Sequence, residues 1–244
     1  MDNLLYKYRS VDKNGLDILI NSALYFPTTS TFNDPFDGQL LPVDFENELK
    51  DLGLHPGPIK LSSANEHIKE EINRVGVFCL CKTPDDILMW SHYADSHQGF
   101  CLGFKPDLKR KIETNGIPIN QYPIAYEADH PFKEIYENYP DINSFEDFIN
   151  LCENFKKAAL TVKHEHWRYE AEERLISRES GLYLFQPEAL DCVILGMNIS
   201  NKDTFTIKNL LNRAEWKHVR LLKAFRGKAA LKLEIREETK FQPI

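Results

Sequence analysis

Short apolar runs typical of buried strands alternate along this chain with helix-like segments, but at irregular intervals. A parallel α/β fold would repeat its strands and helices regularly, and no such period is visible. The strand-like runs are residues 4–9, 23–27, 75–81, 99–104, 123–127, 168–178, 191–195, 217–225 and 228–236. The helix-like segments are residues 14–22, 44–73, 83–93, 127–153 with a continuation to 162, and 206–213. We therefore predict an α+β fold with a mixed, largely antiparallel sheet and flanking helices.

The length and composition fit one globular domain. The chain has 244 residues, of which 42% are hydrophobic and 27% charged, and neither a repeat nor a low-complexity linker divides it. We expect a single domain over residues 1–244. The five cysteines are odd in number and stand mostly in apolar, strand-like segments, which favours reduced core thiols.

The net charge of −7 gives no general attraction to nucleic acid or to an anionic membrane surface. A local exception begins at Lys208 and ends at Arg236, with nine Lys or Arg residues against Glu215 and Glu234. This segment is the candidate surface for nucleic acid, although hairpin strands often have solubilising basic residues. The N-terminus lacks a signal-peptide pattern, and no apolar run approaches the roughly 18 residues that span a bilayer. We expect a cytoplasmic protein, and the oligomeric state stays open.

Three separate stretches combine aromatic with ionisable side chains, which is costly in a plain core. They are residues 32–37 (FNDPFD), 89–99 and 167–174 (WRYEAEER). We predict that they surround one concave site. The candidate catalytic residues are Glu172, Glu170 and His92. The candidate ligand-binding residues in these stretches are Asn33, Asp34, Trp90, Tyr93 and Arg174.

The third stretch is predicted to be a strand in which alternation directs Arg168, Glu170, Glu172 and Arg174 to one face. Two carboxylates and two guanidinium groups could form a site held together by mutual pairing, because Arg binds a carboxylate or a phosphate through two hydrogen bonds. The alternative is a salt-bridge ladder on an exposed strand.

Simpler interpretations exist for several of these residues. Trp90 and Trp167 could stack on a nucleobase or nicotinamide ring, but together with Tyr6 and Tyr8 we expect them to be mostly buried. Asn33 and Asp34 could simply build the turn before Pro35. His92 and His97 are five residues apart and do not share a helical face, and His164 with His166 fits exposed surface histidines better than a metal site. We expect no metal.

Four segments of the chain resemble a known family. They are LYKYRS, FNDPFD, CLCKTPDDILMWSHYADSHQGFCLGF and WRYEAEERLI. In this order, from about Leu4 to Ser200, they closely resemble the bacterial family called domain of unknown function 2971. That resemblance implies no activity.

The chain has an early strand with polar aromatic residues, then a helix, a second strand with a polar loop, and a late strand with Glu-x-Glu. This order of elements is similar to that of ADP-ribosyltransferase folds. Those enzymes bind NAD, as a substrate, in a cleft and use a late-strand glutamate to orient the nicotinamide ribose. The resemblance places Lys7 or Arg9 at the first-strand position, Tyr25 near the second-strand position, and Glu170 or Glu172 at the catalytic position.

The leading hypothesis is therefore an NAD-dependent ADP-ribosyltransferase-like enzyme, as in a bacterial toxin or defence effector. Glu172 would be catalytic with Glu170 in support, while Arg174, Arg9 and Asn33 hold the ligand. One alternative is a metal-dependent nucleotide or nucleic-acid hydrolase that uses Asp34, His92 and Glu172. Another is a domain that senses an anion or nucleotide without turnover.

Overall fold

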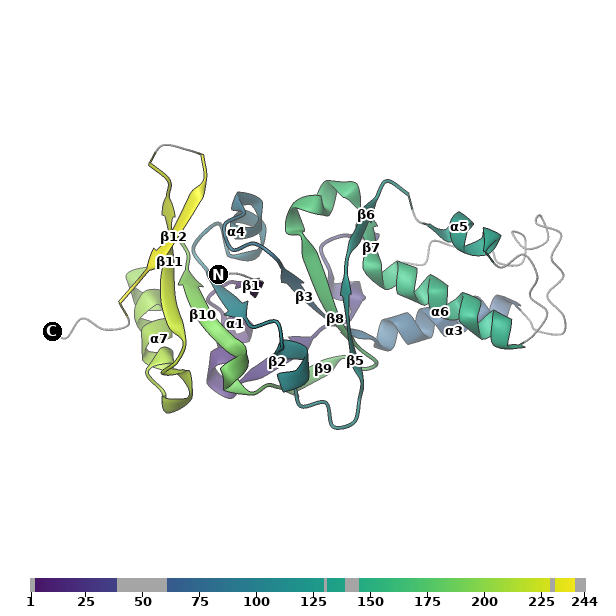
Figure 1. Ribbon diagram of the computed structural model, residues 1–244, viewed down its shortest axis with the longest axis horizontal. Coiled ribbons are helices and arrows are strands. Elements are labelled where there is room, and N and C mark those ends of the chain that lie inside the picture. The colour runs from purple at the N-terminus through teal and green to yellow at the C-terminus, as the bar shows by residue number, and fades with distance from the viewer. Residues whose placement is uncertain (1–2, 39–60, 130, 139–144, 229–230, 240–244) are drawn as a thin grey trace.

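The computed structural model describes residues 3–38, 61–129, 131–138, 145–228 and 231–239 (Figure 1). Within these residues, one sheet has eight strands in the order β12 (Leu233–Glu237), β11 (Arg220–Arg226), β10 (Leu190–Leu195), β4 (Phe100–Phe104), β1 (Leu5–Arg9), β3 (Gly76–Cys81), β8 (Glu172–Ser177) and β5 (Ile119–Pro123). Neighbouring strands are antiparallel, except that β10 and β11 run parallel. The predicted α+β fold with a mixed, largely antiparallel sheet is confirmed.

Smaller elements surround this sheet. Strand β2 (Ala23–Phe26) pairs with β9 (Gly181–Leu184), and β6 (Ala125–Glu127) pairs with β7 (Val162–His164). The helices in the described ranges are α1 (Lys13–Asn21), α3 (Leu61–Arg74), α4 (Ile87–Tyr93), α5 (Phe132–Glu137), α6 (Phe145–Thr161) and α7 (Asn201–Leu211). Figure 1 shows α3 and α6 side by side at one end of the molecule and α7 at the other. No helix in the described part of the chain is long and apolar enough to cross a membrane.

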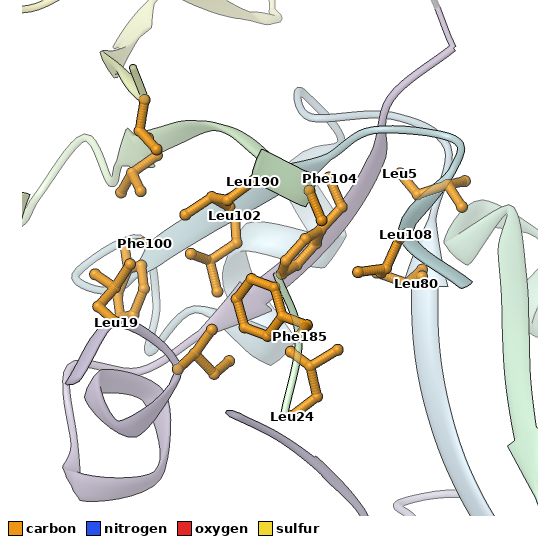
Figure 2. Close-up of a cluster of buried hydrophobic side chains, with 14 of the residues drawn as sticks. Leu5, Leu19, Leu24, Leu80, Phe100, Leu102, Phe104, Leu108, Phe185 and Leu190 are labelled. Atoms are coloured by element: carbon orange, nitrogen blue, oxygen red, sulfur yellow. The ribbon is translucent and has the colours of Figure 1, made fainter. Parts of the chain in front are cut away.

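The sheet is covered on both faces, which explains why its strands β3 and β4 are apolar without interruption. Every residue of β4 is buried. The largest cluster of buried side chains joins β4 and β10 to α1, α7 and the β2–β9 pair, and Figure 2 shows part of it around Phe104 and Phe185. A second cluster packs α3 and α6 against Val77 and Ile176, and a third surrounds Trp90.

The sheet is split between two of its central strands. Five residue pairs join β1 to β4, but Tyr6 with Cys81 is the pair that joins β1 to β3. Beyond this pair the two strands diverge, and the side chain of Lys7 bridges them by donating from Nζ to the carbonyl oxygen of Cys79 at 2.7 Å. The main chain of Val77 instead donates to the carbonyl of Pro27, just after β2. The split leaves space between the strands.

The prediction of one strand over residues 168–178 is wrong in its first half. Residues Glu165–Glu170 form a 3-10 helix, and β8 begins only at Glu172. Ala171, between them, has a left-handed backbone with φ of 42°. The start of the 3-10 helix is capped by the side chain of His164, which accepts from the main chain of His166, and at its end the main chain of Ala171 donates to the carbonyl of Arg168. Strand alternation therefore does not apply before Glu172, and Arg168 is exposed, with Nη2 donating to the carbonyl of Tyr126.

Several helix predictions also need correction. The helix expected from Thr83 is capped by Asp86, whose carboxylate accepts from the main chain of Met89. An Asp at this position satisfies an unpaired helix N–H, so the helix starts at Ile87. The helical segment predicted over 44–73 is α3, from Leu61 onward, and residues 44–60 lie outside the described residues. The stretch 127–153 contains α5 and the start of α6 rather than one helix.

The predicted burial of large aromatic residues is confirmed for Tyr6, Tyr8 and Trp90, which pack in the third cluster. Trp167 is only half-buried, because it lies in the 3-10 helix instead of a strand. The cysteines in the described ranges are free thiols, as predicted.

Candidate functional site

A cleft of about 750 Å³ opens where β1 and β3 diverge. Its lining comes from β1, α1, β2, the loop after β2, β3, α4 and the start of β8. The charged side chains in this lining are those of Lys7, Arg9, Lys13, Asp17, Lys163, Glu170 and Glu172. A concave surface with a few convergent polar groups is the usual form of a ligand site.

The base of this region is a buried cluster of ions centred on Arg174. This guanidinium is fully buried and donates from Nη1 and Nη2 to the two carboxylate oxygens of Asp37, at 2.7 and 2.5 Å. It also donates from Nε and Nη2 to Glu172, at 2.8 and 3.1 Å, and from Nη1 to the carbonyl of Leu160 at 2.8 Å. Paired geometry of this kind compensates the desolvation of buried charges.

Lys163 joins the same cluster from β7. Its Nζ lies 2.6 Å from Glu170, 3.6 Å from Glu172 and 3.7 Å from Asp37. It also lies 4.7 Å from the ring centroid of Trp167. Burial opposes the charge of this amine, but the nearby carboxylates, Glu172 foremost, raise the pKa of Lys163. Lys163 therefore remains protonated.

The two glutamates have opposite shifts. Burial disfavours the charge of Glu172, but Arg174 overrides it and lowers the pKa of Glu172 to about 2. Burial raises the pKa of Glu170, and Lys163 opposes this only in part. Glu170 accepts a hydrogen bond from the hydroxyl of Tyr93. Glu172 is thus kept ionised, whereas the affinity of Glu170 for a proton is increased, and proton affinities separated in this way are the pattern of an acid/base pair.

Strand β1 contributes two cations, Lys7 and Arg9, to the lining of the cleft. The Nε of Arg9 is buried without a hydrogen-bond partner among the described residues, and burial lowers the pKa of Arg9. Burial, with the neighbouring charge of Arg9, also lowers the pKa of Lys7 to about 8. A buried donor without a partner is unfavourable, and an anionic ligand would supply the missing acceptor.

The structure brings most of the predicted site residues to this cleft. Those in its lining are Lys7, Arg9, Tyr25, Asn33, Tyr93, Glu170 and Glu172. Tyr25 is 51% exposed and lies opposite Leu182 of β9, which also lines the cleft.

The other predicted site residues lie outside the lining. Asp34 builds the turn, its Oδ1 accepting from the main chain of Phe36 at 2.9 Å. Trp90 is fully buried, and its Nε1 donates to the carbonyl of Pro84. His92 is exposed. Arg174 lies behind Glu172 and holds it in place.

Three residues of the site were missed by the sequence analysis. Lys163 has no local signal, because it stands in a short strand after a helix. Cys79 was expected only to pack, yet it lines the cleft. Asp37 belongs to the FNDPFD stretch that the sequence singled out, but its pairing with Arg174 had no local signal.

The geometry separates the residues that a hydrolase was expected to combine, because Asp34 and His92 do not line the cleft with Glu172. Across the described ranges, no group of three or more His, Cys, Asp or Glu side chains is arranged to hold a metal ion. The exposed pair of His164 and His166 has ring centroids 4.4 Å apart.

Basic side chains from Lys208 to Arg236 lie on α7, β11 and β12, and several are used locally. The ion pairs are Lys208 with Glu238, Arg220 with Asp191, and Arg236 with Glu234. Contact with nucleic acid through this segment stays a prediction.

Comparison with known proteins gives a limited result. No curated protein and no solved structure matches the chain, so the similarity to ADP-ribosyltransferases has no support from this source. One family model does match, over a shorter segment than the predicted resemblance from Leu4 to Ser200. This segment contains Tyr93, Lys163, Glu170 and Glu172, whereas β1 and the FNDPFD loop precede it. Residues 89–175 match the family described as Protein of unknown function (DUF2971).

Proposed function

We propose that the cleft binds NAD and that the protein breaks the bond between nicotinamide and ribose, passing the ADP-ribosyl group to an acceptor. One observation supports this most directly. Lys7 and Arg9 of the first strand, Tyr25 of the second, and the late glutamates Glu170 and Glu172 line a single cleft. This is the set of positions that the resemblance to ADP-ribosyltransferases implies.

The wall formed by β1 and α1 suits the pyrophosphate of NAD. Arg9 has an unused donor there, and Lys7 and Lys13 add positive charge. A guanidinium binds phosphate oxygens through strong, charge-assisted hydrogen bonds. Tyr25 offers an exposed aromatic face on which a ligand ring can stack.

The glutamates of the cleft suit the end of NAD at which nicotinamide is bonded to ribose. When the glycosidic bond breaks, its electron pair leaves with nicotinamide, which departs neutral, and positive charge develops on the ribose. An ionised carboxylate fixed beside that charge stabilises the transition state. Glu172 fits this role, since Arg174 keeps its pKa near 2 and its position fixed.

Glu170 fits the role of general base. The raised pKa of Glu170 makes it a stronger base than an ordinary carboxylate, which favours proton transfer to it. In the proposed step, the acceptor forms the new bond to the ribose carbon and loses its proton to Glu170. Tyr93 and Lys163 hold the two oxygens of Glu170 in place.

The test is to incubate the purified full chain with NAD labelled in its adenosine part and to measure released nicotinamide, together with transfer of the labelled ADP-ribosyl group to protein, DNA or RNA. We expect Glu172→Gln to lower turnover by about 10²-fold or more while NAD binding persists. The matched control is Glu173→Gln, because Glu173 alternates to the other face of β8 and contacts Gln121. It should leave turnover unchanged.

Glu172→Gln also removes an ion-pair partner of Arg174, so melting must be measured for each variant. Glu170→Gln provides a second variant that leaves the Arg174 pairs intact, and it should also reduce turnover. NAD binding without any product would identify a sensing domain instead, and absence of NAD binding would reject the proposal.

A further inference from the structure

Lys7 differs from Lys163, the buried lysine of the site. Lys163 has three carboxylates within 4 Å, whereas Lys7 makes no ion pair with any residue that the structure describes. Its Nζ donates to the carbonyl of Cys79 and lies 4.8 Å from the ring centroid of Phe78. An amine that lines a cleft and is not paired with a carboxylate can lose its proton more easily, and its nitrogen can then act as a nucleophile.

We propose that Lys7 forms an imine with a phosphorylated aldehyde bound in the cleft. Arg9 stands two residues further along the same strand, and its unpartnered Nε offers a donor to the phosphate. Lys13, on the first turn of α1, lines the same cleft and adds positive charge for the anion. A nucleophilic amine beside an anion site defines the ligand class. This inference does not depend on NAD being a substrate.

The protonation of Lys7 supports the proposal. Burial and the charge of Arg9 lower the pKa of Lys7 to about 8. At pH 7 about a tenth of such an amine is unprotonated, roughly three-hundredfold more than for an ordinary lysine. Lysines with lowered pKa are the ones that proteins use for Schiff bases.

The reaction balances without an oxidant or a reductant. The lone pair of the neutral Nζ forms a bond to the carbonyl carbon, and the carbonyl oxygen takes a proton from water. The resulting carbinolamine loses its hydroxyl group as water while the nitrogen forms the double bond to carbon. Both hydrogens of the amine leave, so that amine and aldehyde become imine and one water.

Pyridoxal 5′-phosphate is a suitable probe, because its imines absorb visible light and borohydride reduces them to stable secondary amines. The full chain is incubated with the probe at neutral pH, reduced, digested and mapped by mass spectrometry. We expect Lys7 to have at least tenfold more label than any other lysine. Pyridoxal, which has the same aldehyde without the phosphate, should label Lys7 at least tenfold less.

Variants separate the contributions of the residues. Lys7→Arg keeps the positive charge, so it should retain the fold and lose the specific label. Lys202→Arg, at an exposed position of α7 outside the cleft, is the matched control and should keep the label on Lys7. Arg9→Gln should reduce the preference for the phosphorylated probe over pyridoxal, since it removes the anion partner.

The proposal is overturned if the label is spread over exposed lysines such as Lys82 and Lys202, or if pyridoxal labels Lys7 as well as its phosphate does. Mapping of the unaltered chain decides this even if Lys7→Arg fails to fold. Because labelling involves no glycosidic bond, a protein that does not cleave NAD can still pass this test, and one that cleaves NAD can fail it.

Discussion

Asp37 and Arg174 lie 137 residues apart in the chain and meet through two parallel hydrogen bonds that are shielded from solvent. This ion pair connects the FNDPFD loop to β8. Asn33, four residues before Asp37, is thereby held at the cleft that Glu172 also lines. The buried ion pair positions two separate walls of the site relative to each other.

Replacing Asp37 should therefore destabilise the fold. Asp37→Asn leaves Arg174 with a full charge and only one carboxylate, and breaking a buried pair in this way costs about 3–5 kcal/mol of unfolding free energy. Urea denaturation followed by circular dichroism measures the loss. The control is Asp129→Asn, on an exposed residue, which should change stability by less than about 0.5 kcal/mol. Equal stabilities for the two variants would contradict the role of the pair.

The pH dependence of stability should follow the shift of Glu172. The pKa of Glu172 falls from an ordinary value of 4.5 to about 2 on folding, so its ionised form stabilises the native state above pH 4.5. That contribution is lost as the pH falls from 4.5 towards 2, and it amounts to something on the order of 3 kcal/mol. The contribution of Glu170 to stability has the opposite pH dependence. Because its pKa is raised on folding, protonation of Glu170 favours the native state.

Denaturation curves at a series of pH values between 7 and 2 check this prediction. Glu172→Gln should remove most of the loss of stability below pH 4.5, because glutamine does not titrate. The variant will be less stable at pH 7, where the ionised carboxylate would otherwise pair with Arg174. If the variant kept the full acid sensitivity of the unaltered chain, other carboxylates would be responsible.

Much of the fold could be predicted because its signals are local. Strand β4 is an apolar run that is buried throughout, and α7 begins after Ser200, whose hydroxyl accepts from the main chain of Asp203. The strand predicted over residues 168–178 failed for a non-local reason. Glu170 is buried through its contacts with Lys163 and Tyr93, and this arrangement favours a turn over continued alternation.

The residues of the site could likewise be predicted where the sequence near them, or the resemblance, gave a signal, and not where they depend on distant partners. Glu170 and Glu172 were indicated by charged residues within an otherwise strand-like segment, and Lys7, Arg9 and Tyr25 by the resemblance. The partner of Arg174 in the FNDPFD loop could not be identified, because nothing local links residues so far apart. Lys163 was missed for a related reason, since its burial depends on carboxylates from three segments.

Trp90 should be among the largest single contributors to stability. Its side chain is fully buried, makes an edge-to-face contact with Tyr8 at a centroid distance of 5.1 Å, and donates from Nε1 to Pro84. Trp90→Ala would leave a cavity and should cost about 3–5 kcal/mol. Trp167→Ala is the comparison, because the half-buried Trp167 should lose less. An unchanged melting curve for Trp90→Ala would contradict its burial.

The last prediction concerns Ala171, which turns the chain between the two glutamates. Its φ of 42° lies in the left-handed region, where a side chain with a Cβ costs about 1 kcal/mol relative to glycine. Ala171→Gly should relieve this strain. The gain in stability is partly offset because glycine has greater freedom in the unfolded chain, so the free energy of unfolding should be unchanged or up to about 1 kcal/mol higher.

Ala171→Val should act in the opposite direction, because a β-branched residue tolerates this backbone poorly, and we expect a loss of about 1–3 kcal/mol. The control is Ala125→Val at an exposed position of β6, where valine suits a strand and stability should hold. Thermal melting of the three variants is sufficient. If Ala171→Val melted at the same temperature as the unaltered chain, the turn would have adopted another backbone conformation. The separation of Glu170 from β8 would then not depend on the left-handed backbone at position 171.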